Sequence, residues 1–427
     1  MKRSRWIMLV IALLLAGSVA VNMVGCAARV QADDLMEGIH PAKITLPPAD
    51  DRFFPSQMEF SLNLFERVFE QNDGQNVLIS PLSVNLALAM TANGAAGDTQ
   101  SQMEQVIGAG ASIDSWNEFL LAYQTSLSSG EKHRLSIANS IWIRDEQDRL
   151  NVERDFLQKN ADYYGAAAYR SAFDGQTIQD INRWVKDKTD GRIEKILNDI
   201  RPETILYLVN ALAFEAEWQT VYSKEDISDG SFTNGDGSQQ TVSMMSSTES
   251  YYLDDGKATG FIKPYCGGQY SFVALLPQKG LSLSDYVDYL QEQTAETMLD
   301  RIINPESAAV QVKLPKFSYD FSTNMNEPLK ALGMEAAFDE SLADFSRLGR
   351  SSAGNIFIGN VIHGTHIAVD ELGTKAGAVT LVEMNDTAAL VDPAMKKVVL
   401  DRPFLYLIVD QVSGLPLFLG AVTDLSK

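Results

Sequence analysis

The sequence predicts an α+β fold in one large domain. Helical patterns gather in the first third of the globular part, and β-rich segments dominate the remainder. Because helices and strands do not alternate along the chain, a parallel sheet built from βαβ units is disfavoured. The chain has 427 residues, 45% of them apolar, and no internal repeat, which is enough for a single large core.

The predicted helices come first. Residues 61–69 and 99–107 carry apolar side chains at helical spacing. Between them, Ser80 precedes Pro81, and a serine followed by proline is typical of a capped helix start. The helix that begins there is expected to continue through residues 84–92.

The predicted strands lie later in the chain. Residues 135–144 alternate in part, and residues 205–214 are β-rich and mostly apolar, as a buried central strand should be. Six further segments have the composition of strands: 269–277, 308–315, 357–369, 398–400, 405–409 and 417–422.

The first residues read as a targeting segment. Lys2, Arg3 and Arg5 precede an apolar run at 6–21, which is shorter than a membrane span of about 20 residues. The run ends in Met23-Val24-Gly25-Cys26, which resembles a bacterial lipobox in which the thiol of Cys26 is acylated. We therefore expect a signal peptide at 1–25, a flexible tether at 26–55 and one domain at 56–427. An uncleaved signal anchor and a plain secretion signal are the alternatives.

Charge and cysteine content exclude several classes of protein. The formal net charge of −21 disfavours nucleic-acid partners, because such a surface repels phosphate backbones. The only cysteine besides Cys26 is Cys266, so a secreted form of this chain has no disulfide framework. Its stability is expected to come from packing alone.

Catalytic signatures are missing from the sequence. It contains no G-x-S-x-G, no H-E-x-x-H and no P-loop pattern. His363 and His366 are three apart in a predicted strand, so they face opposite sides and are not expected to share a metal. No flanking motif supports Cys266 as a nucleophile, and a half-buried structural thiol is the simpler interpretation. We expect no enzyme activity, no cofactor and no metal.

Several sequence blocks stand out along the chain. They are Asn76-Val77-Leu78-Ile79-Ser80-Pro81-Leu82-Ser83, Ala138-Asn139-Ser140-Ile141-Trp142, Ile181-Asn182-Arg183-Trp184-Val185, Leu208-Val209-Asn210-Ala211, Leu314-Pro315-Lys316-Phe317, Arg402-Pro403-Phe404 and Leu417-Phe418-Leu419-Gly420. In this order and at similar spacing, from about residue 60 to the end, they resemble the serpin family. The resemblance implies an α+β serpin fold with three β-sheets, a dominant central sheet surrounded by about eight or nine helices, and an exposed reactive-centre loop.

Residues 370–380 are similar to the hinge of the serpin reactive loop. Residues 373–392 contain no proline, although a loop that never becomes a strand has no reason to avoid it. In a strand, the face that carries Thr374 would hold only uncharged side chains as far as Met384, ahead of Asp386, and Lys375, where the family usually has Glu, would lie on the other face. An ordinary hairpin arm explains the alternation but not the length or the missing proline. The expected hinge residues are Glu371, Gly373, Thr374, Ala376, Gly377, Ala378 and Thr380.

The resemblance implies a mechanism. A serine protease attacks the loop and forms an acyl-enzyme, and the cleaved arm then inserts as an extra strand that carries the protease with it. Two clusters would control the opening of the sheet. Ser80, Ser83, Asn210 and His363 match the polar cluster beneath the opening strands, and Trp218, Lys316 and Glu371 match the point where insertion begins, with an ion pair expected between Lys316 and Glu371.

Family spacing from Gly373 places the cleaved bond at Thr387–Ala388. A small Thr followed by Ala favours elastase-like or subtilisin-like proteases. We expect a monomer at the outer surface of a bacterial cell, with a membrane contact through its lipid only and a covalent complex with its target protease. One alternative is a non-inhibitory serpin-fold binding protein at the cell surface. The other is a hydrolase that uses Cys266 or a serine.

Overall fold

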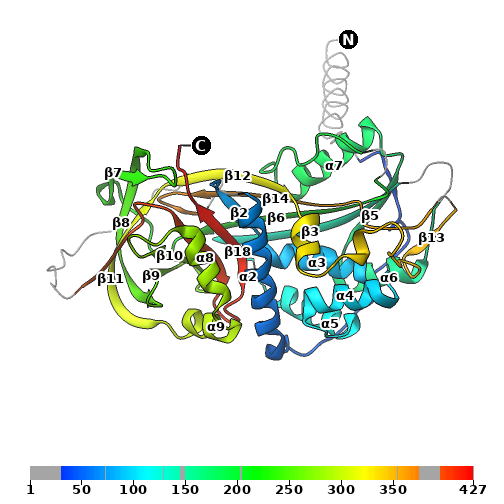
Figure 1. Ribbon diagram of the computed structural model, residues 1–427, viewed down its shortest axis with the longest axis horizontal. Helices are drawn as coiled ribbons and strands as arrows, with labels where there is room; N and C mark the ends of the chain where they lie inside the picture. Colours follow the sequence, from blue (N-terminus) through cyan, green and yellow to red (C-terminus); the bar gives the residue numbers. More distant parts are fainter. Residues whose placement is uncertain are drawn as a thin grey trace, which may run out of the picture.

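The computed structural model describes residues 30–72, 74–127, 129–144, 150–201, 204–352, 354–374 and 395–426. These residues form the expected α+β architecture, with sheets of seven, nine and two strands. Figure 1 shows α3 to α6 gathered at one end of the molecule and α8 and α9 beside the nine-stranded sheet. The helices are α2 (Phe54–Gln71), α3 (Pro81–Ala92), α4 (Gly97–Gly108), α5 (Ile113–Ser126), α6 (Arg154–Tyr164), α7 (Gly175–Lys188), α8 (Leu283–Gln291), α9 (Ala295–Ile303) and α10 (Asn326–Ala331).

The seven-stranded sheet holds most of the expected site. Its strands, in spatial order, are β1 (Asp33–Asp34), β5 (Ala167–Ser171), β3 (His133–Arg144), β6 (Leu206–Glu217), β15 (Gly373–Thr374), β14 (Asn360–Val369) and β12 (Phe317–Asn324). The predicted central strand at 205–214 is β6, and nine of its twelve residues in succession, from Leu206 to Phe214, are buried. Continuous burial is what a strand covered on both faces requires.

The nine-stranded sheet packs behind it and completes the core. Its strands, in spatial order, are β16 (Lys396–Val399), β11 (Glu306–Pro315), β8 (Gln239–Asp254), β9 (Ala258–Pro264), β10 (Tyr270–Pro277), β17 (Phe404–Asp410), β18 (Pro416–Val422) and β2 (Val77–Ile79), and β7 (Ile227–Thr233) pairs with β8. The small sheet pairs β4 (Leu150–Val152) with β13 (Gly349–Ser351).

Helix α3 underlies the centre of the seven-stranded sheet. It begins as predicted, because the Ser80 hydroxyl accepts a hydrogen bond from the Ser83 N–H and Pro81 occupies the first turn. All of its residues are buried, and it packs against β3, β6 and β18. A helix that is apolar on every side belongs in a core, and this one carries Ser80 and Ser83 to the underside of β6 and β14.

No helix was predicted between residues 108 and 427, yet α5 to α10 lie there. Helix α7 shows what signal was available. Asp174 caps its first turn and forms a reciprocal capping box with Thr177, and the helix is strongly amphipathic over its length. An N-cap aspartate directly ahead of an amphipathic pattern was therefore the available signal.

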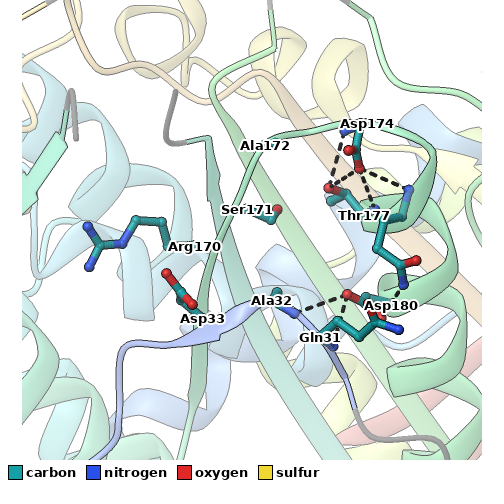
Figure 2. A pocket seen from close by; sticks show the side chains of 10 residues that line it. Gln31, Ala32, Asp33, Arg170, Ser171, Ala172, Asp174, Thr177 and Asp180 are labelled. Atoms are coloured by element: carbon teal, nitrogen blue, oxygen red, sulfur yellow. Dashed lines mark hydrogen bonds between the residues drawn. The ribbon is translucent and has the colours of Figure 1, made fainter. Parts of the chain in front are cut away.

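The N-terminal segment differs from the expected tether. From Val30 onward the chain lies against the domain: the buried Asp180 carboxylate accepts the N–H groups of Gln31 and Ala32, as Figure 2 shows. Strand β1 then pairs with β5, and Leu35, Met36 and Ile39 pack against the core. The tether predicted for 26–55 is therefore corrected for residues 30–53, because partly buried apolar side chains of this segment pack against the core and its two residues in β1 pair with β5.

The expected signal peptide at 1–25 and Cys26 lie outside the described residues. Among the helices that the structure describes, none is both long enough and apolar enough to span a bilayer. The half-buried thiol expected at Cys266 agrees with the structure, where this residue is free and partly exposed.

Candidate functional site

The seven-stranded sheet is split at one end by the two residues of β15. Gly373 pairs with Glu217 and Thr374 with Ala216 of β6, in antiparallel register, while Thr374 also pairs with Val369 of β14. A Cβ on residue 373 would collide with the carbonyl oxygen of Ala216, so only glycine fits this close approach. The hinge segment therefore begins a strand between β6 and β14.

Thr374 faces the interior of the protein. It is 3% exposed, and its hydroxyl lies 2.5 Å from the hydroxyl of Tyr265. This is the face that the sequence pattern assigned to it. Because side chains alternate along a strand, a continuation of β15 would turn the uncharged set of loop residues inward as well.

The backbone that leads into β15 is held by what we call the hinge cluster: Trp218, Tyr222, Tyr265, Lys316 and Glu371. The Trp218 N–H donates to the carbonyl of Leu372 at 2.9 Å, and its indole N–H donates to the carbonyl of Asp370 at 2.8 Å. The Tyr222 N–H donates to the carbonyl of Glu371 at 3.0 Å. The Trp218 ring stacks on Tyr265 with centroids 4.5 Å apart. Three successive carbonyls are thereby fixed beside the split.

The ion pair expected between Lys316 and Glu371 is present. The Lys316 Nζ lies 2.5 Å from Glu371 Oε2, and this hydrogen bond is the main reason that the pKa of Glu371 lies below its ordinary value. The two side chains are 29% and 37% exposed, so solvent screens much of their attraction.

Further along, the sheet is closed. Strands β6 and β14 pair directly and in parallel from Tyr207 with Asn360 to Ala211 with Gly364. A strand that continued β15 would have to separate these two strands. The polar residues predicted to lie beneath them are brought together here, and we call Ser80, Ser83, Asn139, Asn210 and His363 the closure cluster.

The closure cluster fixes the protonation of His363. The Ser80 N–H donates to His363 Nε2 at 3.0 Å, so this nitrogen carries no proton. His363 Nδ1 therefore carries the proton and donates to Asn210 Oδ1 at 2.9 Å. The imidazole is fully buried, and burial lowers its pKa to about 3. It is neutral at physiological pH.

Asn210 links the cluster to its surroundings. Its amide nitrogen lies 2.5 Å from both the Ser83 carbonyl and the Asn139 side-chain oxygen, and it donates to both. Ser83 contributes only its backbone, because its buried hydroxyl has no partner among the described residues. Asn139 was not among the predicted residues, and it lies directly opposite Asn210 in the pairing of β3 with β6. A buried polar residue inside a quoted family block was the available signal.

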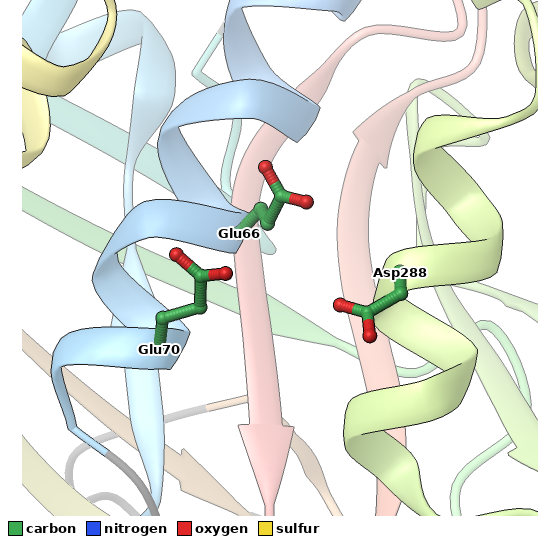
Figure 3. Close-up of side chains that lie close together, drawn as sticks. All are labelled: Glu66, Glu70 and Asp288. Atoms are coloured by element: carbon green, nitrogen blue, oxygen red, sulfur yellow. The ribbon is translucent and has the colours of Figure 1, made fainter.

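The remaining candidates lie apart from the site. His366 faces away from His363, as predicted, and its Nδ1 lies 2.7 Å from Asp320. Figure 3 shows Glu66 and Glu70 of α2 near Asp288 of α8. Arg67 pairs with both glutamates, so we assign no ligand to this group.

The predicted hinge residues beyond Thr374 and the predicted bond lie outside the described residues. These residues are Ala376, Gly377, Ala378, Thr380, Thr387 and Ala388. On the far side of this segment, β16 begins at Lys396 and pairs in parallel with β11. The segment thus starts in the seven-stranded sheet and ends at the edge of the nine-stranded sheet.

Comparisons with known proteins agree with this geometry. A family model described as Serpin (serine protease inhibitor) matches residues 55–425. Leukocyte elastase inhibitor A of Mus musculus is 30% identical over 374 residues, which cover 85% of this chain and 97% of the relative. Neuroserpin of Homo sapiens is 28% identical over 387 residues, with 86% and 91% covered.

Two solved structures are informative because they show one protein in two states. The thermophilic serpin tengpin in its native state is 45% identical with a TM-score of 0.87, and the match covers 93% of this chain and all of that one. Tengpin in its latent state is 42% identical with a TM-score of 0.78, covering 90% and 100%. By TM-score, this structure is more similar to the native state of tengpin than to its latent state.

Proposed function

The chain belongs to the serpin family, and on that premise we propose that it is a secreted suicide-substrate inhibitor of serine endopeptidases. A target protease cleaves a peptide bond in the loop that follows β15, and it is held as an acyl-enzyme through the new carboxyl end of the arm. The cleaved arm then extends β15 between β6 and β14. The observation that carries the proposal is that β15 already occupies the first two positions of such a strand.

Backbone pairing supplies the driving force. A strand inserted between two neighbours forms ladder hydrogen bonds on both edges, and at about 1 kcal/mol net each a strand of about 14 residues gains on the order of 10 kcal/mol. The whole stability of an ordinary domain is ~5–15 kcal/mol. The uncleaved protein must then be held by a kinetic barrier.

The closure cluster can supply the energy barrier that keeps β6 and β14 together before cleavage. Extension of β15 has to break the direct pairing of β6 with β14, and the hydrogen bond from His363 to Asn210 joins these strands. Buried polar groups left without partners are costly, so the intermediate with parted strands is high in energy. Cleavage releases the arm that can then occupy the gap.

We place the reactive bond at Thr387–Ala388 and the targets among elastase-like or subtilisin-like proteases. Small residues on both sides of the bond suit shallow specificity pockets. The similarity to a leukocyte elastase inhibitor supports the same class of target. Sequencing the peptide that elastase releases tests the placement: it should begin at Ala388, and any other first residue overturns it.

One experiment separates inhibition from the alternatives. The protein is incubated with elastase, subtilisin and trypsin and run on a denaturing gel. A covalent band of summed mass with elastase or subtilisin is expected. Clean cleavage without that band would favour the non-inhibitory serpin-fold binding protein at the cell surface. Thr374→Arg provides the internal control: it must bury a guanidinium beside Tyr265, so the variant should be cleaved as a substrate.

We further propose that the protein is anchored to the outer surface of a bacterial membrane by lipid on Cys26. Val30 follows Cys26 by four positions, so at ~3.5 Å per residue the link reaches at most about 14 Å. Following the strand pairing across β5 and β3, Asp33 is in register with Leu206, which is the first residue of β6. Gly373 pairs with Glu217, at the other end of β6. Roughly 35 Å of strand would separate the anchored end from the split.

This arrangement would turn the split end of the sheet away from the membrane and toward proteases in solution. Mass spectrometry of membrane-extracted protein should find diacylglycerol on Cys26, and Cys26→Ser should release the protein into the medium. An unmodified N-terminal Met1 in the membrane fraction would contradict the anchor.

A further inference from the structure

A second, buried ion pair lies behind the hinge cluster. Lys263 of β9 and Glu249 of β8 are 2% and 10% exposed, and Lys263 Nζ lies 2.8 Å from Glu249 Oε1. Burial lowers the pKa of Lys263, while the Glu249 carboxylate opposes that shift. A charge pair withdrawn from water this far is costly unless its surroundings compensate it.

Two aromatic rings of the hinge cluster provide that compensation. The Lys263 ammonium lies 4.4 Å from the ring centroid of Tyr222 and 5.3 Å from that of Trp218. The Tyr222 hydroxyl lies 3.2 Å from Ser247 Oγ, which in turn donates to Glu249 at 2.6 Å. Each of four residues therefore contacts the next, and the last contacts the first: Lys263, Glu249, Ser247 and Tyr222.

The same two aromatic residues hold the backbone that enters β15. Trp218 donates to the carbonyls of Asp370 and Leu372, and Tyr222 donates to the carbonyl of Glu371. A cation over an aromatic face fixes the position of the ring as well as stabilising it. The Trp218 ring beside the Lys263 ammonium carries the indole N–H that bonds Asp370, whereas Tyr222 reaches Glu371 through its backbone N–H, so Trp218 is the more direct link from Lys263 to residues 370–372.

We propose that Lys263 and Glu249 act as a positioning pair that keeps Trp218 and Tyr222 against residues 370–372 and thereby slows insertion of the uncleaved loop. The proposal rests on the proposed function, since it assumes that the loop can insert. It assigns part of the barrier to a pair on β8 and β9, outside the seven-stranded sheet and the hinge itself.

The test compares Lys263→Met with Lys330→Met. Lys330 is a surface control, because it also pairs with a glutamate, Glu327 at 2.8 Å, and lies 5.8 Å from the ring centroid of Phe338, but its side chain is 37% exposed and it sits on α10. Intact protein is held at a raised temperature, and conversion to a form resistant to urea unfolding is followed by native gel. Lys263→Met should convert at least about tenfold faster than the parent. Lys330→Met should match the parent.

A second readout excludes a merely structural role. The loop is cut with a protease, and the urea midpoint of the cleaved form is compared between the parent and the double variant Lys263→Met with Glu249→Gln, which leaves no unpaired buried charge. We expect equal midpoints, because the inserted strand, not the pair, then holds the sheet. Equal destabilisation of intact and cleaved forms, or an unchanged conversion rate, overturns the proposal.

Two further variants cover the case in which Lys263→Met does not fold. Glu249→Gln keeps the shape and removes one charge, and it should also speed conversion. Lys263→Met combined with Glu249→Gln leaves no buried charge, and it should convert faster than the parent because the cation over the rings is gone. A double variant that converts at the parent rate contradicts the proposal. The assay needs no target protease, so failure to trap proteases would count against the proposed function alone.

Discussion

The imidazole of His363 on β14 donates a hydrogen bond to the side-chain oxygen of Asn210 on β6, with 2.9 Å between the two atoms. The two residues are also register partners in the direct pairing of these strands. Any strand that extends β15 must pass through this contact. The closure cluster around it is therefore the place where small chemical changes should alter the behaviour of the whole sheet.

Acid should weaken the closed sheet through His363. Its pKa of about 3 lies below the ordinary value of 6.5, so between these pH values the unfolded chain binds a proton that the folded protein excludes. Stability from this residue is complete above about pH 6.5 and falls with decreasing pH, by about 2 kcal/mol at pH 5. Thermal unfolding from pH 7 to pH 5 measures it. His363→Gln should show a shallower pH dependence, and an equal slope would contradict the assignment.

Replacing Asn210 with Ala should lower the free energy of unfolding, whereas replacing Ser83 with Ala should not. Asn210→Ala leaves the His363 N–H, the Asn139 oxygen and the Ser83 carbonyl without their partner, which should cost about 3 kcal/mol or more. Ser83→Ala removes a buried hydroxyl that has no partner among the described residues, so it should be neutral or stabilising. Urea unfolding of both variants tests this difference. A costly Ser83→Ala would show that its hydroxyl is bonded.

Gly373→Ala should displace the start of the inserted strand. The added methyl group would collide with the Ala216 carbonyl, so residues 373 and 374 should leave the sheet and expose Thr374. Limited proteolysis near residue 374 should become faster, and the yield of covalent protease complex should fall. Gly175→Ala is the control, because nothing lies within 4 Å of a Cβ at that position. Unchanged proteolysis of Gly373→Ala would rule out the close approach.

The partly exposed ion pair between Lys316 and Glu371 should stabilise the protein less than the buried pair between Lys263 and Glu249. Both side chains are about a third exposed, so a double-mutant cycle with Lys316→Met and Glu371→Gln should give a coupling of about 1 kcal/mol or less, and less still at high salt. The measurement is unfolding of the intact protein at two salt concentrations. A larger coupling that is insensitive to salt would mean that the pair is shielded from solvent.

Local patterns predicted much of the fold and of the hinge. The apolar run of β6 and the Ser80-Pro81 start of α3 are properties of neighbouring residues, and both appear where expected. The inward face of Thr374 likewise follows from alternation along a strand. The helices after residue 108 were missed although their sequences carry signals: a side-chain cap starts α5, α7, α8 and α9, and α7 is amphipathic over its length.

The sequence by itself determined which segments could be strands, which face of the hinge is free of charge, and, through its resemblance to a family, which polar residues belong beneath the sheet. The tertiary structure alone decided that residues 30–53 pack on the domain, that Asn139 joins Asn210, and that Lys263 lies under two aromatic rings. These contacts join residues far apart in the chain, such as Gln31 with Asp180. Such contacts form only when strands and helices that are distant in the chain pack together, so the residues next to a side chain in the sequence do not predict them.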